Sequence, residues 1–215
     1  MEKLQSLLAE FNRHGSDGDE NWHRQFSVTP FPAYWRIVYR LLSDLKSGNV
    51  GLRVREIGAG YGDISAVALH LGFTDVAACE RCAEKALQAR AKIKMLFGRD
   101  DVIWNCDYDR WGDRRLCDVL IMVNCVYVEN AKTRQEYVTR LQEIVAEAGD
   151  PRYFIYEAVD VRYDGNDAAF PEPVRLSEPD LVAAFPHRAV VGWDTYRRPA
   201  NRSDKRIYFL TREDP

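Results

Sequence analysis

The spacing of hydrophobic positions changes near residue 50. Before that point, apolar residues recur every three or four positions, as on one face of a helix: Leu4, Leu7, Leu8 and Phe11, and then, beyond Pro32, Trp35, Val38, Tyr39 and Leu42. This pattern predicts that residues 1–48 form an N-terminal helical cap.

From residue 52 onward, short apolar runs alternate with helical stretches. The runs that predict strands are 52–57, 75–79, 101–105, 118–123 and 153–156. Such alternation is typical of a parallel sheet with crossover helices. Segments 189–196 and 206–210 follow without a helix between them, so they are expected to pair antiparallel. We therefore expect residues 49–215 to form an α/β domain with a seven-stranded, mostly parallel sheet, in one compact unit with the cap.

Local signals mark the helices of the second half. Thr133 with Glu136, and Ser177 with Asp180, have the spacing of a capping box, in which each residue binds the backbone N–H of the other. Gly149 marks the expected end of the first of these helices.

Charge and composition narrow the possible functions. The 215 residues carry a net charge of −3 and a sequence pI near 5.9, so no overall field attracts a polyanion. The pattern of a signal peptide is missing at Met1 to Gln5, and no apolar run reaches transmembrane length. We expect a cytoplasmic protein that is neither a dedicated nucleic-acid binder nor a membrane binder.

The cysteines give no sign of a disulfide framework or a metal site. There are five of them, an odd number in a chain without a secretion signal. Cys79 and Cys82 form a CxxC pair, and Cys106 could join them, but no second pair follows at the spacing of a zinc site. We expect these residues to be small side chains at strand ends.

The most informative stretch is R-E-I-G-A-G-Y-G-D, residues 55–63. Glu56 and Ile57 end the first predicted strand, a glycine-rich turn follows, and Asp63 starts the next helix. Ligands of open α/β sheets bind beyond the carboxyl ends of the strands, so this loop is expected to contact one. A dinucleotide fingerprint would need glycine at position 63, where its pyrophosphate rests on the helix N-terminus. The carboxylates of Glu56 and Asp63 would repel a phosphate and attract a cation.

An acidic residue followed by x-G-x-G-x-G, as in Glu56 to Gly62, resembles the first motif of the class I S-adenosylmethionine-dependent methyltransferases. The resemblance covers residues 52–157 and the terminal strand pair, which is similar to the reversed hairpin that closes that family's sheet. It implies a Rossmann-like fold and S-adenosylmethionine as the cofactor. The positions it assigns to cofactor binding are Glu56, Gly58, Ala59, Gly60, Tyr61, Gly62, Glu80, Arg81, Cys106, Asp107 and Asn124.

Two acidic residues in this set match specific positions of the family. Glu80, at the end of the second strand, matches the residue that accepts both ribose hydroxyls, and a carboxylate can accept from two neighbouring donors. The alternative is that Glu80 caps the following helix. Asp107, beyond the third strand, matches the acceptor for the adenine amino group, and its alternative is a turn aspartate.

The fourth strand ends in Asn124-Cys125-Val126-Tyr127, which resembles the N/D-P-P-Y signature of methyltransferases that act on planar amino groups. Both prolines are missing, so the rigid turn that presents backbone carbonyls to an amine is not assured, and this argues against an adenine or glutamine-amide methylase. Asn124 is expected to line the cofactor or substrate pocket. Tyr127 is either a packing residue or part of the catalytic site.

Methyl transfer needs in-line displacement, and positioning supplies much of the acceleration. A base helps where the nucleophile is a hydroxyl; the candidates are His14, His23 and Glu157, each with a structural role as the alternative. The expected catalytic set is therefore His23, Glu157, Asn124 and Tyr127.

Two further clusters have open interpretations. The aromatic residues Phe31, Tyr34, Trp35 and Tyr39 either offer ring faces to a sulfonium or pack on the core. The terminal hairpin loop is rich in basic residues, which either face solvent or recognise an anionic group on the substrate: Arg197, Arg198, Arg202, Lys205 and Arg206.

The expected function is S-adenosylmethionine-dependent methylation of an oxygen or nitrogen of a small molecule, because only the N-terminal helices and residues 160–173 are free to cover a substrate. One alternative is intramolecular cyclisation of S-adenosylmethionine to an azetidine amino acid, with release of methylthioadenosine. Another is a non-catalytic binding module. The sequence leaves the oligomeric state open.

Overall fold

The computed structural model describes residues 4, 6, 33–114, 116–125, 131–163, 170–197 and 203–212. The helices are α3 (Ala33–Gly48), α4 (Asp63–His70), α5 (Ala83–Phe97), α6 (Arg134–Glu147) and α7 (Glu178–Ala184), with short 3-10 turns η1 (Tyr108–Arg110), η2 (Gly112–Arg114) and η3 (Glu172–Val174). The strands are β1 (Arg53–Ile57), β2 (Asp75–Glu80), β3 (Ile103–Asn105), β4 (Val119–Met122), β5 (Tyr153–Asp160), β6 (Arg175–Leu176), β7 (Arg188–Arg197) and β8 (Ser203–Arg212).

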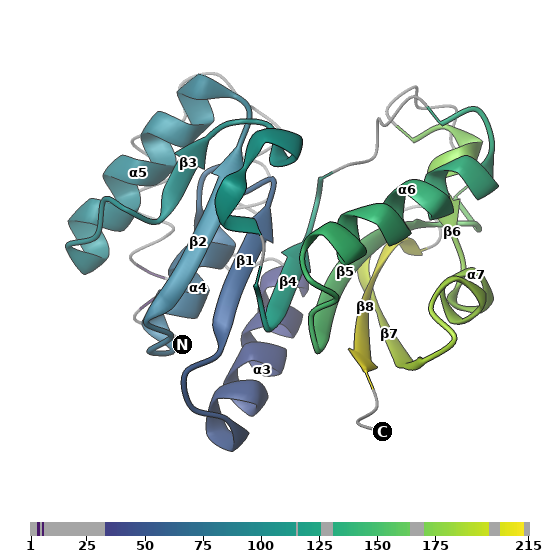
Figure 1. Ribbon diagram of the computed structural model, residues 1–215, viewed down its shortest axis with the longest axis horizontal. Helices are drawn as coiled ribbons and strands as arrows, with labels where there is room; N and C mark the ends of the chain where they lie inside the picture. Colours follow the sequence, from purple (N-terminus) through teal and green to yellow (C-terminus); the bar gives the residue numbers. More distant parts are fainter. Residues whose placement is uncertain are drawn as a thin grey trace.

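All strands join one sheet in the order β3-β2-β1-β4-β5-β8-β7, with β6 paired to β5 off this path (Figure 1). The strands from β1 to β5 pair in parallel, whereas β8 runs antiparallel to both β5 and β7. The predicted parallel sheet with a reversed terminal hairpin is thus confirmed. The order of the strands reverses between β1 and β4, the point at which open α/β sheets bind ligands.

The sheet has eight strands rather than the expected seven. The additional strand, β6, has only two residues and pairs with Val159 and Asp160 of β5. β6 can pair with β5 because β5 continues to Asp160. The pairing of β5 with β4 already ends at Tyr156. Two residues are too few to show a period in the sequence, so β6 could not be found there.

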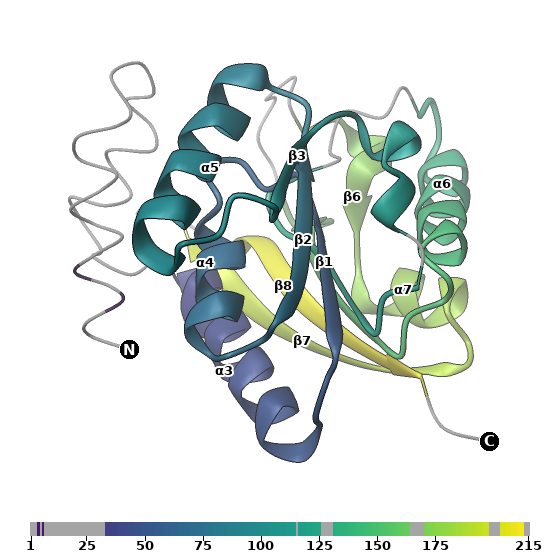
Figure 2. The same cartoon turned by 60° about the vertical axis from the view of Figure 1, so that its left-hand side comes forward.

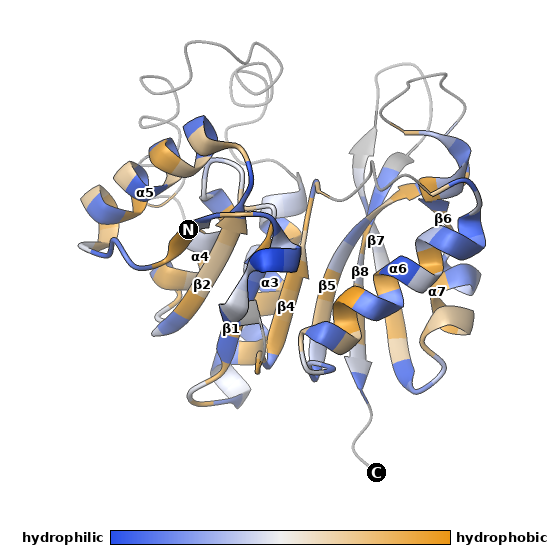
Figure 3. Cartoon of the chain, turned by 45° about the horizontal axis from the view of Figure 1, so that its top comes forward, coloured by the Kyte–Doolittle hydropathy of each residue, from blue (hydrophilic) through white to orange (hydrophobic). Residues whose placement is uncertain are grey.

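Two apolar clusters lie on opposite faces of the sheet. Helices α3, α4 and α5 cover one face, and α6 and α7 cover the other (Figure 2). In Figure 3 the strands β2 and β4 are largely hydrophobic, while α5 and α6 alternate between apolar and polar residues. This is the pattern of strands buried on both faces and of helices with one buried side.

Helix α3 begins where the sequence predicted, close to Pro32, and buries the expected face. The side chains of Trp35, Val38 and Leu42 are almost fully buried, and Tyr39 packs at the edge of the same cluster. Apart from Leu4 and Ser6, the rest of the expected cap before residue 33 lies outside the described residues.

Capping side chains start α6 and α7 as predicted. Ser177 and Asp180 form the reciprocal capping box of α7. Thr133 accepts from the backbone N–H of Glu136 at α6, but the Glu136 carboxylate binds the N–H of Lys132 instead of Thr133.

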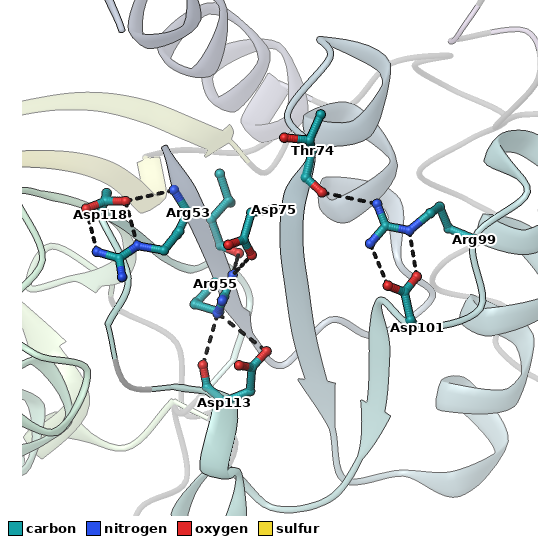
Figure 4. A network of polar contacts seen from close by, with 9 residues as sticks. Arg53, Arg55, Thr74, Asp75, Arg99, Asp101, Asp113 and Asp118 are labelled. Atoms are coloured by element: carbon teal, nitrogen blue, oxygen red, sulfur yellow. Dashed lines mark hydrogen bonds and ion pairs between the residues drawn. The ribbon is translucent and has the colours of Figure 1, made fainter. Parts of the chain in front are cut away.

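Ion pairs join the strands at the end of the sheet where the parallel strands begin (Figure 4). Arg53 forms two side-chain hydrogen bonds with Asp118, just before β4. The buried guanidinium of Arg55 binds Asp75 at the start of β2 and the backbone oxygen of Asp113. These bonds hold β1 against both of its neighbours and leave the opposite end of the sheet for a ligand. Of the helices in the described residues, none has the length and apolar character that crossing a membrane requires.

Candidate functional site

A cavity of about 620 Å³ opens at the carboxyl ends of β1, β2, β3 and β4. Its walls are the segments that follow these strands, together with the first turn of α3 and the start of α4. The volume lies in the range typical of small-molecule sites, roughly 300–1,000 Å³. All the residues that the sequence assigned to cofactor binding line this cavity except Gly62.

The glycine-rich loop adopts a backbone that side chains would disturb. Gly58 has φ +75°, and a Cβ placed there would lie 2.3 Å from the Cβ of Cys125. Gly62 has φ +76° and lies behind the cavity, where its own Cβ would be 3.0 Å from that of Ala89 in α5. The first glycine therefore lets the segment after β4 approach the loop, and the third lets α5 pack against the start of α4.

Glu80 connects this loop to the next one. Its Oε2 accepts the backbone N–H of Gly60, and its Oε1 accepts that of Cys82, both at 2.8 Å. The second bond ties Glu80 to Cys82, the residue before α5, but it is not a helix cap, because α5 begins without a side-chain cap. Each carboxylate oxygen keeps a second lone pair, so these two bonds do not prevent Glu80 from accepting ligand hydroxyls as well. Asn105 donates to the backbone oxygen of Glu80 and holds β3 beside it.

The acidic residues on either side of the loop carry less free charge than the sequence indicated. Asp63 is buried and accepts from the ammonium of Lys92 at 2.6 Å, and Lys92 in α5 is fully buried. Burial raises the pKa of Glu56 to about 8, although the hydroxyl of Ser65 donates to it at 2.5 Å and opposes this shift. Glu56 is therefore mostly protonated at pH 7, and Asp63 is neutralised by a cation that local sequence patterns do not reveal.

The segment after β3 forms the next wall. Cys106 and the exposed Asp107 line the cavity, followed by Tyr108 and Asp109. Arg140 of α6 holds this wall from outside: its guanidinium lies over the ring of Tyr108 and binds Asp109 at 2.5 Å.

Two of the candidate catalytic residues meet at the end of β4. Asn124 lines the cavity and has φ +56°, a left-handed conformation that asparagine tolerates better than most residues. Its backbone N–H donates to Glu157 Oε2 at 3.1 Å, and the hydroxyl of Thr195 lies 3.0 Å from Glu157 Oε1. Glu157 is 1% exposed and is not among the residues that line the cavity. Its carboxylate therefore binds Asn124 from the protein interior and does not face a ligand.

The aromatic cluster divides between the site and the core. Tyr34 and Trp35 are buried in the core and also line the cavity, and burial raises the pKa of Tyr34 well above its ordinary value. Tyr39 packs beside His70 with ring centroids 6.5 Å apart. Several candidates lie outside the described residues: His14, His23, Phe31, Tyr127, Arg198 and Arg202.

The basic residues of the hairpin also divide. Arg206 pairs with Asp194 of the neighbouring strand at 3.2 Å, away from the cavity. Lys205 instead reaches Asn124, and its Nζ lies 2.6 Å from the side-chain oxygen.

Several residues in or behind the cavity were missed from the sequence: Cys79, Cys82, Lys85, Lys92, Tyr108, Asp109 and Arg110. The positions just after strand ends could have been found from their place in the pattern, because such positions meet at one edge of a parallel sheet. Lys92 gave no such signal.

Burial favours the thiol form of two cysteines that line the cavity. Burial raises the pKa of Cys79 to about 12 and that of Cys125 well above its usual range. The thiol of Cys125 donates to the backbone oxygen of Ile57 at 2.9 Å. Within the described ranges, no group of three or more His, Cys, Asp or Glu side chains could hold a metal ion.

No protein-family model and no curated protein sequence matches the chain. Solved structures do match. Magnesium protoporphyrin IX methyltransferase from Synechocystis PCC 6803, crystallised with S-adenosylmethionine, has a TM-score of 0.64 at 15% identity over 98% of this chain and 97% of its own. A putative RNA methyltransferase from Pyrococcus horikoshii gives 0.58 at 17% identity over 99% and 97%.

The N-methyltransferase NodS from Bradyrhizobium japonicum WM9 gives 0.59 at 12% identity over 86% of this chain and 98% of its own. These matches span nearly the whole length of the proteins compared, at identities that establish fold alone. The chain therefore has the Rossmann-like fold of the S-adenosylmethionine-dependent methyltransferases, as the motif at Glu56 to Gly62 indicated.

Proposed function

We propose that this protein binds S-adenosylmethionine in the cavity and transfers its methyl group to a small-molecule acceptor. The observation that carries the proposal is the position of Glu80. Its carboxylate ends β2, lines the cavity and is fixed by the N–H groups of two loops. A rigid acceptor at this place suits a pair of ribose hydroxyls.

The other walls suit the rest of the cofactor. The backbone of Gly58 to Gly60 would contact the methionine part, with Glu56 and Asp63 near its ammonium. Cys106 and Asp107 would contact the adenine, and Asp107 would accept from its amino group. The rings of Tyr34 and Trp35 would offer π faces to the sulfonium. S-adenosylmethionine is also the ligand of the magnesium protoporphyrin IX methyltransferase that shares this fold.

The chemistry is a displacement in which positioning dominates. The acceptor must lie opposite the sulfur, at the methyl carbon, and in this proposal the residues at the end of β4 hold it there. The negative overall charge favours a small molecule over a nucleic acid, although proteins of this fold include both kinds.

Binding is tested by titration calorimetry with S-adenosylmethionine and S-adenosylhomocysteine. We expect both to bind the wild-type protein, and Glu80→Ala to weaken binding by at least about tenfold, since hydrogen bonds to a charged group are lost. Asp100→Ala removes an exposed carboxylate at the opposite end of the sheet and serves as the control. Equal affinities of wild type and Glu80→Ala would refute the site, and no binding to either ligand would refute the function.

Turnover is tested by chromatography of the nucleoside products. We expect S-adenosylhomocysteine, formed only when an acceptor is added. When the methyl group of S-adenosylmethionine is labelled and a cell extract supplies the acceptor, the label should appear in the small-molecule fraction of the extract rather than in its RNA. Rapid formation of methylthioadenosine without an acceptor would show that the enzyme cyclises S-adenosylmethionine instead of transferring its methyl group. Label in the RNA would show that the acceptor is RNA rather than a small molecule. Binding without any turnover would favour a non-catalytic module.

A further inference from the structure

The side chain of Asn124 is held in one orientation by a lysine from a distant strand. Lys205 of β8 lies 81 positions away in the sequence, and its Nζ donates to Asn124 Oδ1 at 2.6 Å. An ammonium has only donors, so the oxygen of the amide must face it and the NH2 group must face away. The chemistry of the partner therefore fixes which end of the amide is which.

The groups around this bond hold both partners in place. Glu157 accepts the backbone N–H of Asn124 at 3.1 Å and lies 3.7 Å from the Lys205 ammonium as its counter-charge. Thr195 binds Glu157 from β7, and the Lys205 ammonium also lies over the ring of Phe170, 5.0 Å from its centroid. The Lys205 side chain is 13% exposed and Asn124 is exposed, so the bond joins a mostly buried ammonium to an amide that a ligand can reach.

Only Asn124 of this group lines the cavity. With its oxygen bound to Lys205, it offers the cavity an NH2 donor, and the Lys205 ammonium lies 2.6 Å from that oxygen with Glu157 as its counter-charge. A protonated amine is a cation with donors only, so the ammonium at this oxygen repels it, although the oxygen keeps a second lone pair. An anionic oxygen is the reverse case, because it accepts from the NH2 and is attracted by the ammonium.

We propose that the methyl acceptor is an anionic oxygen, as in a carboxylate, that binds the NH2 of Asn124, and that Lys205 is the positioning residue that selects it over an amine. This rests on the proposed function, of which it names the substrate class. In the reaction an oxygen lone pair forms the new C–O bond, and the electrons of the methyl C–S bond pass to sulfur. The sulfonium becomes a neutral thioether, the carboxylate becomes a methyl ester, and no proton has to be removed.

The residues that follow Asn124 in the sequence agree with this choice of acceptor. The motif that presents an amine to backbone carbonyls is incomplete in the sequence, and the side-chain oxygen that would join those carbonyls is bound to Lys205. Both observations argue against a planar amino group as the acceptor.

The test uses the full chain loaded with S-adenosylhomocysteine, after its binding has been measured by calorimetry. Benzoate and benzylamine, matched in size, are titrated while NMR follows the side-chain NH2 of Asn124, whose signal is assigned by its loss in Asn124→Asp. We expect benzoate to shift this signal and to bind at least about tenfold more tightly than benzylamine, as a charge-assisted hydrogen bond requires.

Variants separate positioning from a structural role. Lys205→Met should reduce the preference for benzoate over benzylamine by at least about tenfold, and Lys205→Arg should restore part of it. The exposed Lys94→Met removes one positive charge elsewhere and should leave the preference unchanged. Asn124→Asp should abolish benzoate binding, because a carboxylate has no donor.

Benzylamine binding as tightly as benzoate, or neither probe reaching the Asn124 signal, would overturn the proposal. The wild-type titration decides this even where a variant fails to fold. Failure of S-adenosylhomocysteine to bind in the first step would be a failure of the proposed function itself.

Discussion

Burial changes the protonation state of Glu56, the acidic residue of the glycine-rich motif. Its carboxyl is 2% exposed, and desolvation raises its pKa from an ordinary 4.5 to about 8. The folded protein therefore binds a proton at Glu56 between about pH 4.5 and pH 8 that the unfolded chain does not. The stability that this proton confers is complete below pH 4.5 and is lost as the pH rises through 8.

We predict that the free energy of unfolding of the ligand-free protein falls by up to roughly 4 kcal/mol between pH 5 and pH 8.5 through Glu56 alone. The Glu56→Gln variant keeps an acceptor for Ser65 but has no group that titrates at position 56. Its free energy of unfolding should therefore lack this dependence on pH. Urea unfolding of both proteins at a series of pH values measures the difference. Parallel pH profiles for the two proteins would show that Glu56 titrates normally.

At the scale of elements, the start of α4 and the middle of α5 are joined by one buried ion pair. Asp63 and Lys92 have side-chain exposures of 3% and 0%, and the close approach of Gly62 to Ala89 allows the helices to pack here. Burial lowers the pKa of Lys92 from its ordinary value. A charge in this position is costly unless its partner is present, so the pair specifies how α5 lies on the glycine-rich loop.

Lys92→Met should destabilise the protein by about 3–5 kcal/mol, because it removes the counter-charge of the buried Asp63. The double variant Asp63→Asn with Lys92→Met should be more stable than Lys92→Met alone, since no charge is then left uncompensated. Denaturant unfolding of the two single variants and the double variant gives the coupling. Strictly additive losses would mean that the two side chains do not depend on each other.

At the scale of the whole molecule, the cavity is built from segments distant in the chain. The loops after β1, β2, β3 and β4 supply its walls, and α3 adds its first turn. The hairpin of β7 and β8 contributes through Thr195 and Lys205, behind Asn124. A ligand in this cavity contacts loops from across the parallel sheet, so its binding energy adds to the stability of the folded chain.

Saturating S-adenosylhomocysteine should therefore raise the thermal midpoint of the entire unfolding transition. At a ligand concentration one hundred times Kd, the gain in unfolding free energy is about 2.7 kcal/mol. Differential scanning calorimetry measures it, and Glu80→Ala should show a smaller rise at the same ligand concentration. A midpoint that stays constant with ligand would contradict binding to the folded state.

Features that depend on neighbours along the chain were predictable from the amino-acid sequence alone. Alternating apolar runs predicted the strands and their parallel pairing, and the glycines with Glu56 located the loop that the cavity follows. The family resemblance singled out Glu80 and Asp107, and both line the cavity because residues at or just after the ends of parallel strands lie at that edge of the sheet.

Only the tertiary structure decided the charges and contacts around these residues. The neutralisation of Asp63 by Lys92, the position of Glu157 beneath Asn124 and the bond from Lys205 to Asn124 join residues that are 29 to 81 positions apart. Such contacts leave no local period or spacing in the sequence. They follow from how helices and strands pack, which also determines the burial that sets the pKa of Glu56.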